Sequence, residues 1–164
     1  MKKTVLALLC LGVVAVIGAQ ESKKLDPAID ALSNFVGGKW VAENGPIPVE
    51  QEWTWNRDKR GLNVVAIIGK GTPNLMQSKA FIGWDPLEKK AYYLDMHDSE
   101  LTYYGHVTHT DGTIEFRFGQ LGSGKVSFTE RGKFIGKDEW RATMYQLKDG
   151  KENAIMSFMM KRQR

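Results

Sequence analysis

The side chains best suited to metal binding or acid–base chemistry are the three histidines and the acids beside them. His106 and His109 are three residues apart in a strand-like stretch, and on a strand this odd spacing sends the two imidazoles to opposite faces. Both could hold one zinc ion only if His109 lay in a turn and folded back. His97 follows Asp95 by two residues, so both side chains point to the same face and could form a general acid–base pair. Because Asp and His beside turns are ordinarily hydrated, we predict no metal site and no catalytic residue.

The sequence gives no support to nucleophilic catalysis. Cys10 is the one cysteine and stands in an N-terminal apolar run, and no Gly-x-Ser-x-Gly motif positions a serine nucleophile. We therefore expect that the protein is not an enzyme. The pair of Asp95 and His97 leaves a ligand-modifying reaction open as a minor alternative.

Aromatic side chains in strand-like runs are the group that indicates binding. In a barrel they either fill the core or line a ligand cavity, and polar residues on the same face separate the two cases. Gln51 shares the face of Trp53, Asp95 shares the face of Tyr93, and Arg141 is assigned to such a face as well. Polar groups turned inward need partners or water, which is typical of a wet cavity. The predicted ligand-binding residues are Gln51, Trp53, Trp55, Tyr93, Asp95, Tyr103, Phe116, Phe118 and Arg141.

Ten short runs rich in Val, Ile, Thr and aromatic residues are predicted to be the strands that position these side chains. Turn residues separate them, such as the Asp-Gly pairs Asp111-Gly112 and Asp149-Gly150. The connections are too short for helical crossovers, so the sheet must be antiparallel and in up-and-down order. The predicted strands cover residues 39–43, 49–56, 62–68, 78–84, 91–96, 100–108, 113–119, 125–131, 139–146 and 153–161.

Alternation within these runs gives the sheet one apolar and one polar face. Ile114, Phe116 and Phe118 alternate with Glu115 and Arg117, for example. A sandwich and a closed barrel are both compatible with this pattern, but closure removes the unpaired edges and suits the simple strand order. We predict an all-β fold, an up-and-down antiparallel barrel of about ten strands. A short helix over residues 25–36, which ends at two glycines, precedes the strands.

The N-terminus has the pattern of a bacterial secretory signal peptide. Lys2 and Lys3 form a positive head, residues 5–17 are an apolar run, and Ala19 is a small residue at the expected cleavage site. The run of about thirteen residues is too short for a membrane span of roughly 20 residues. We expect a signal peptide at residues 1–19, a barrel domain at residues 20–164, no stable membrane insertion after cleavage, and a periplasmic or secreted protein.

Charge and composition do not fit a nucleic-acid-binding protein. The formal net charge of the full chain is +4, and Lys and Arg are interleaved with acids, whereas nucleic acid requires a stripe of one sign. Since Cys10 lies in the expected signal peptide, the mature chain would contain no cysteine. It would then fold on its hydrophobic core without disulfides.

Four segments carry a family resemblance. The predicted helix runs directly into Gly38 and Trp40 in a Gly-x-Trp pattern, a tryptophan-containing strand follows at residues 52–55, an aromatic-Asp-Pro hairpin lies at residues 81–90, and the last strand ends at Arg162. In these segments the chain resembles a family of small secreted bacterial proteins that have a domain of unknown function and a lipocalin-like, calycin-type β-barrel. The resemblance implies the barrel, with Trp40 at its closed end and a late arginine stacked across that indole, Arg162 as the first candidate and Arg164 as the second. Some lipocalin-like barrels hold haem through a late histidine, but this chain has none after His109, so we expect no cofactor.

The leading hypothesis is an exported barrel protein that binds a small apolar or amphipathic ligand in its interior. Lipids, sterol-like compounds and aromatic metabolites are not distinguished by the sequence. The main alternative is a non-catalytic structural or interaction module with a fully packed barrel, and the minor alternative is the ligand-modifying enzyme. Inward-facing side chains at Gln51, Asp95 and Arg141 would favour the ligand-binding hypothesis.

Overall fold

The computed structural model describes residues 24–42 and 45–163. The signal peptide predicted at residues 1–19 lies outside the described residues. A short helix precedes ten strands: α1 (Pro27–Leu32), continued by a 3-10 turn (Ser33–Phe35), then β1 (Lys39–Ala42), β2 (Val49–Trp55), β3 (Leu62–Ile68), β4 (Met76–Asp85), β5 (Lys90–His97), β6 (Thr102–Thr110), β7 (Thr113–Gln120), β8 (Phe128–Phe134), β9 (Glu139–Lys148) and β10 (Lys151–Gln163).

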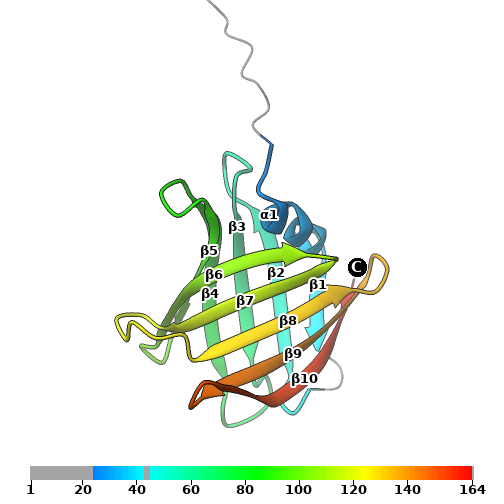
Figure 1. Ribbon diagram of the computed structural model, residues 1–164. Coiled ribbons are helices and arrows are strands. Elements are labelled where there is room, and N and C mark those ends of the chain that lie inside the picture. Colours follow the sequence, from blue (N-terminus) through cyan, green and yellow to red (C-terminus); the bar gives the residue numbers. More distant parts are fainter. Residues whose placement is uncertain (1–23, 43–44, 164) are drawn as a thin grey trace, which may run out of the picture.

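The strands form one closed barrel. Each strand pairs antiparallel with its neighbours in sequence, and β1 pairs with β10. At that seam Lys39 lies opposite Gln163 and Ala42 lies opposite Met160. In Figure 1, β2 to β5 run steeply across the back of the molecule and β6 to β10 cross in front of them. Closure leaves no exposed sheet edge, and the predicted all-β up-and-down antiparallel barrel with a short N-terminal helix is confirmed.

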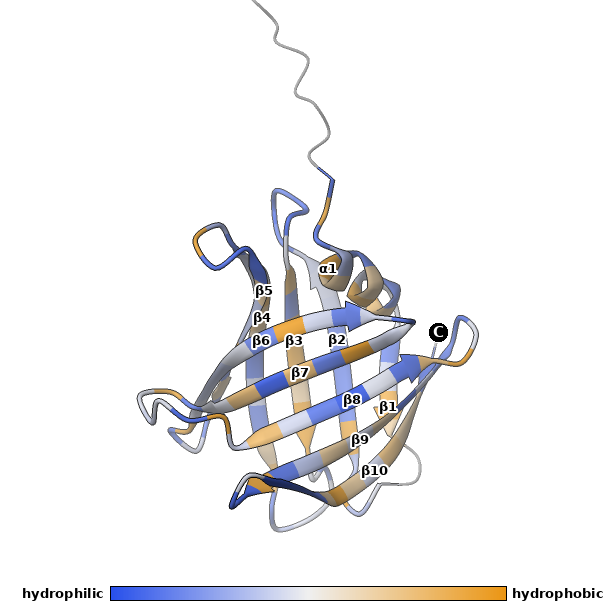
Figure 2. Ribbon diagram, in the orientation of Figure 1, coloured by the Kyte–Doolittle hydropathy of each residue, from blue (hydrophilic) through white to orange (hydrophobic). Residues whose placement is uncertain are grey.

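The alternation of apolar side chains puts the core inside the barrel. On β7, Ile114, Phe116 and Phe118 are buried and Arg117 is exposed. Figure 2 shows this alternation as hydrophobic and hydrophilic segments that succeed each other along the strands. In the pair Asp111-Gly112, φ is +50° and +73°, as in a type I′ turn, whose twist matches that of the strands it joins.

The N-terminal helix and an aromatic cluster close one end of the barrel. Asp26 caps α1, because its side chain accepts hydrogen bonds from two backbone N–H groups of the first turn. The indole N–H of Trp40 donates to the carbonyl of Phe35 at 2.8 Å. The ring of Phe35 packs against four other rings, with centroid distances of 4.5–5.2 Å, and we call this group the aromatic plug: Phe35, Trp40, Trp53, Phe134 and Trp140.

Arg162 of β10 holds the plug from outside. Its guanidinium lies 4.8 Å from the centroid of the Trp40 ring, which confirms the predicted stacking, a contact worth about 1 kcal/mol. The same guanidinium donates to the carbonyl of Val36 at 3.0 Å. Gly38 turns the chain from the helix into β1 at a φ of +83°, and a Cβ there would lie 2.8 Å from the carbonyl oxygen of Gln163. Only glycine fits this left-handed, crowded position.

The strand that departs most from its predicted bounds is β8. It begins at Phe128 rather than at residue 125 and continues to Phe134. Gly122 and Gly124 in the preceding loop both have positive φ, so the chain stays in an irregular loop for longer than the sequence pattern indicates.

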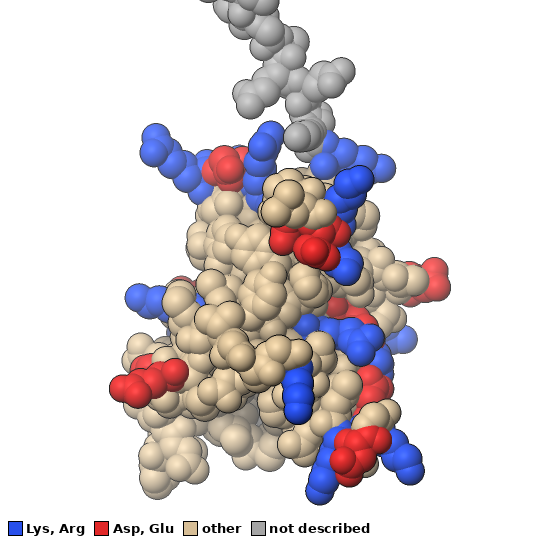
Figure 3. Space-filling model, turned by 60° about the vertical axis from the view of Figure 1, so that its left-hand side comes forward, with Lys and Arg blue, Asp and Glu red and all other residues tan. Residues whose placement is uncertain are grey.

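The surface charges are mixed. Figure 3 shows Lys and Arg beside Asp and Glu on the face in view. Two of the surface ion pairs are Lys70 with Glu50 at 2.8 Å and Arg131 with Glu152 at 2.6 Å, and such exposed pairs contribute little to stability. In the part of the chain that the structure describes, no helix has the length and apolar character needed to cross a bilayer.

Candidate ligand-binding cavity

The barrel encloses two adjoining cavities. The deep cavity, about 70 Å³, lies against the aromatic plug. The mouth cavity, about 270 Å³, extends to Gly45 and Ile47 in the β1–β2 loop, away from the helix. Eight residues line both cavities, and we call them the shared wall: Gln51, Ala66, Ser78, Tyr93, Asp95, Phe118, Glu130 and Phe158. Because one set of side chains borders both spaces, we treat the two cavities as one site.

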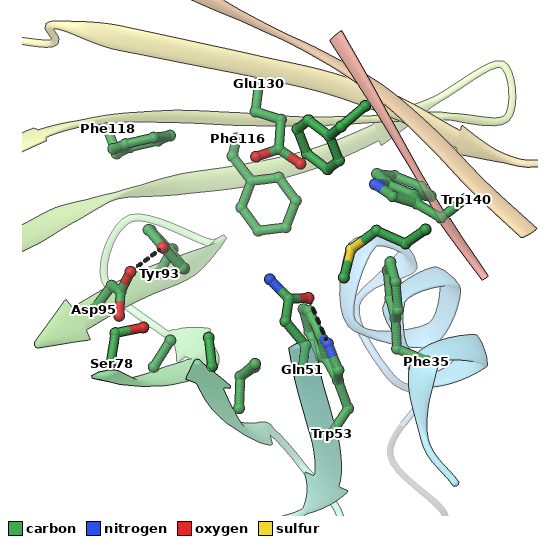
Figure 4. A pocket seen from close by; sticks show the side chains of 15 residues that line it. Phe35, Gln51, Trp53, Ser78, Tyr93, Asp95, Phe116, Phe118, Glu130 and Trp140 are labelled. Atoms are coloured by element: carbon green, nitrogen blue, oxygen red, sulfur yellow. Dashed lines mark hydrogen bonds between the residues drawn. The ribbon is translucent and has the colours of Figure 1, made fainter. Parts of the chain in front are cut away.

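Strand alternation turns the polar residues of the shared wall inward. On β2, Gln51 lies on the face of Trp53, and the Trp53 indole N–H donates to Gln51 Oε1 at 3.0 Å. This bond leaves the Gln51 amide NH₂ available as a donor in the cavity. On β4, Ser78 is 5% exposed. Figure 4 shows these side chains, together with those of β5 and β8, converging on the same space.

Three side chains of β5 form a hydrogen-bonded row along the cavity. The Tyr93 hydroxyl donates to Asp95 Oδ2 at 2.7 Å, and His97 Nε2 lies 3.0 Å from the same oxygen. The residues are two positions apart, so all three face the interior. Burial, followed by the charge of Asp95, raises the pKa of Tyr93 well above its ordinary value, so the phenol remains a donor.

Asp95 keeps unused hydrogen-bonding capacity. The residue is 8% exposed, and among the described residues its second oxygen, Oδ1, is buried without a hydrogen-bond partner. An ionised carboxylate accepts up to about four hydrogen bonds, and leaving a buried acceptor unpaired is unfavourable. Asp95 is therefore the side chain of the site best prepared to accept a further donor.

Glu130 brings a second carboxyl to the shared wall from β8. It lies opposite Phe116 of β7 and Met144 of β9 in the sheet, and Figure 4 shows its carboxyl beside the Phe116 ring. Glu130 is partly exposed to the cavity, but the burial of its carboxyl raises its pKa from 4.5 to about 7, and among the described residues no basic group or donor offsets this rise. At neutral pH the carboxyl therefore exchanges between its neutral and ionised forms.

Seven of the nine predicted ligand-binding residues line the two cavities: Gln51, Trp53, Tyr93, Asp95, Tyr103, Phe116 and Phe118. Trp55 shares the inner face of β2 but borders an outer groove with Gly38 and lines neither cavity.

The prediction that Arg141 faces inward is wrong. Its side chain is 61% exposed and contacts Glu139 at 2.6 Å on the outer surface. The inward positions of β9 belong to Trp140 and Ala142, which are buried. Burying a large indole is strongly favourable and burying an unpaired guanidinium is costly, so these side chains determine which face of the strand turns inward.

Three polar residues of the site were absent from the predicted set: Ser78, His97 and Glu130. The sequence could have indicated that these side chains point inward, because they share a strand face with apolar residues. Glu130, for example, shares its face with Phe128 and Phe134. The predicted same-face geometry of Asp95 and His97 is confirmed by their contact.

The other two histidines face opposite ways, as predicted. The His106 ring lies 5.7 Å from that of Tyr104 on the outside of β6, whereas His109 has the parity of the buried Val107. Within residues 24–42 and 45–163, no three His, Cys, Asp or Glu side chains come together in a way that could hold a metal ion.

The fold has a counterpart among solved structures. The chain is similar to Rv2717c from M. tuberculosis, whose crystal structure superposes with a TM-score of 0.54 at 18% sequence identity, over 86% of this chain and 100% of that chain. A likeness at this identity shows the fold alone. No protein-family model matches the chain, and no curated protein matches it. The resemblance to the lipocalin-like family of secreted proteins therefore stays a prediction.

Proposed function

We propose that this chain is an exported barrel protein that binds a small apolar or amphipathic molecule in its interior. The observation that supports this most is the mouth cavity, about 270 Å³, lined by aromatic and aliphatic side chains around a few converging polar groups. Ligand pockets have this composition, and their volumes begin at roughly 300 Å³. The ligand is therefore small. Burial of its apolar part would contribute about 25 cal/mol per Å².

Export rests on the signal-peptide pattern of residues 1–19. Expression in a bacterial host should place the protein in the periplasm or medium, with an N-terminus at Gln20 on sequencing. An intact Met1 N-terminus on cytoplasmic protein would contradict export and would leave the binding proposal unaffected.

A cavity-filling variant tests the binding site. Ala66 is buried and lines both cavities, so Ala66→Leu adds bulk where the ligand would lie. Its neighbour Val65 is 48% exposed on the outer face, and Val65→Leu is the matched control. Titration of wild type with a neutral hydrophobic dye should give saturable binding. Ala66→Leu should weaken it at least tenfold and Val65→Leu should leave it unchanged. If wild type gives no saturable signal, or both variants behave alike, the interior is not the binding site.

A second candidate function is acid–base turnover of the bound ligand, favoured by the contact between Asp95 and His97 at 3.0 Å. A carboxylate that orients an imidazole is a common arrangement for proton transfer. His97→Ala would abolish such a reaction, whereas His106→Ala on the outer face would not. A substrate screen in which wild type and His97→Ala give equal rates would exclude it.

A further inference from the structure

We propose that the cavity selects an organic cation: a small molecule with an apolar, preferably aromatic, body and a protonated amine that binds the carboxyls of the shared wall. This inference rests on the proposed binding function and narrows its ligand class.

The first observation is the charge of the lining. The described residues that line the two cavities include the carboxyls of Asp95 and Glu130 and no Lys or Arg. Arg131, the residue after Glu130, points outward and binds Glu152 and Glu115. His97 also lines the mouth cavity, but its Nε2 already contacts Asp95 at 3.0 Å. An anionic ligand such as a fatty acid would therefore bury its carboxylate beside two acids, without a Lys or Arg among the described lining residues to pair with it, which is strongly unfavourable.

The second observation is that both carboxyls have unused capacity. Asp95 Oδ1 is buried and unpartnered among the described residues, although Oδ2 accepts from Tyr93 and lies 3.0 Å from His97 Nε2. No neighbouring group offsets the burial of Glu130. A buried carboxylate is stabilised by a cation that also donates hydrogen bonds, and an ammonium group supplies both.

The third observation is the aromatic environment of these acids. Tyr93 packs edge-on against Phe116 at 5.4 Å and against Phe118 at 5.5 Å, and all three rings border the cavity with the acids. Ring faces attract a desolvated ammonium, and they also bury an apolar body.

A metal ion does not account for the acids. Asp95, His97 and Glu130 do not form a group that could hold one, and no other such group occurs in the described residues. Two acids in an apolar wall also fall short of the six or more oxygen ligands of Ca²⁺ and Mg²⁺. An organic cation needs fewer polar contacts and uses the apolar lining.

Three probes with nearly the same body test the inference: 2-phenylethylamine, 2-phenylethanol and 3-phenylpropionate, titrated by calorimetry at pH 8. At this pH Glu130, with a pKa of about 7, is mostly ionised, while an alkylammonium, with a pKa of roughly 10, remains protonated. The amine should bind at least tenfold more tightly than the alcohol, and the carboxylate should not bind measurably.

Variants then locate the cation. Glu130→Gln should reduce the amine affinity at least tenfold and leave the alcohol affinity within twofold, and Asp95→Asn should act in the same direction. Glu52 is exposed on the outer face of β2, beside Gln51, so Glu52→Gln changes the net charge equally and should have no effect.

The outcomes separate this inference from the binding proposal. Equal affinities of amine and alcohol for wild type, or tighter binding of the carboxylate, would overturn the inference and leave interior binding in place. An amine preference that survives in both Glu130→Gln and Asp95→Asn would overturn it as well. No binding of any of the three probes would overturn the inference, and the dye titration of wild type and Ala66→Leu decides separately whether the interior binds a ligand.

Discussion

Replacing Glu130 with glutamine should make the variant more stable relative to wild type as the pH rises. Glutamine keeps the size and polarity of the side chain and removes its ionisation. Burial raises the pKa of Glu130 from 4.5 to about 7. At about 1.4 kcal/mol per pH unit, this rise corresponds to roughly 3 kcal/mol between the folded and unfolded chains, as an order of magnitude.

The sign follows from proton binding. Between pH 4.5 and 7 the folded protein holds the Glu130 proton and the unfolded chain has lost it. The native state therefore binds more protons, so the free energy of unfolding falls as pH rises through this interval and levels off above it. Wild type should lose up to about 3 kcal/mol from this group by pH 8, and Glu130→Gln should not.

Urea unfolding of wild type and Glu130→Gln at pH 4, 5.5, 7 and 8 measures the effect. The other titratable side chains lining the cavities, Tyr93, Asp95, His97 and Tyr103, are present in both proteins, so their contributions largely cancel in the difference. The stability of the variant relative to wild type should increase by up to about 3 kcal/mol between pH 4 and pH 8. A difference that stays constant to within 0.5 kcal/mol, or that shrinks as pH rises, would refute the assignment of a buried, ionising carboxyl at Glu130. Glu52→Gln, on the outer face, should give such a constant difference.

Three further changes test other parts of the structure. Arg162→Lys keeps the charge but loses the planar guanidinium that stacks on Trp40 and donates to the carbonyl of Val36, so thermal unfolding should show a loss of roughly 2–3 kcal/mol; unchanged stability would mean that these contacts of Arg162 with the aromatic plug contribute nothing. Gly38→Ala places a Cβ 2.8 Å from a carbonyl oxygen at a φ of +83°, and calorimetry should show a loss of roughly 2 kcal/mol or more, whereas stabilisation would contradict the left-handed turn. Tyr93→Phe removes the donor to Asp95 Oδ2 and should cost roughly 1–3 kcal/mol by urea unfolding at pH 8; an equal or more stable variant would show that the hydroxyl does not pair with Asp95.

The sequence predicted the barrel well because its strands are amphipathic and its turns are short. On β7 the apolar residues Ile114, Phe116 and Phe118 occupy one parity without exception, so the inward face follows directly. The Asp-Gly pairs have the positive φ values that two-residue hairpins need.

The inward assignment that failed is that of Arg141 on β9. On β9, Trp140, Ala142 and Met144 share one parity and Arg141 and Thr143 share the other. The alternation itself therefore puts the indole inside the barrel, and the prediction placed Arg141 on the wrong face. The volume of the cavity and the absence of a counter-ion near Glu130 depend on side chains from several strands at once. No local pattern could indicate them.

The energetics of Glu130 bear on the choice between a ligand-binding barrel and a packed one. A barrel that served only as a structural or interaction module would be more stable with an apolar side chain at this inward position, because a buried ionisable group without a partner lowers stability at neutral pH. Asp95 Oδ1, which is buried without a hydrogen-bond partner among the described residues, is a second feature that a fully packed core would not have. Features of this kind are expected where a site must accept a ligand, since the bound molecule supplies the partner that the protein lacks. The two acids thus favour a ligand-binding barrel over a fully packed one. The carboxyl of Glu130 has no positive partner among the described residues, which lowers the stability of the empty barrel, and a bound cation would supply that partner.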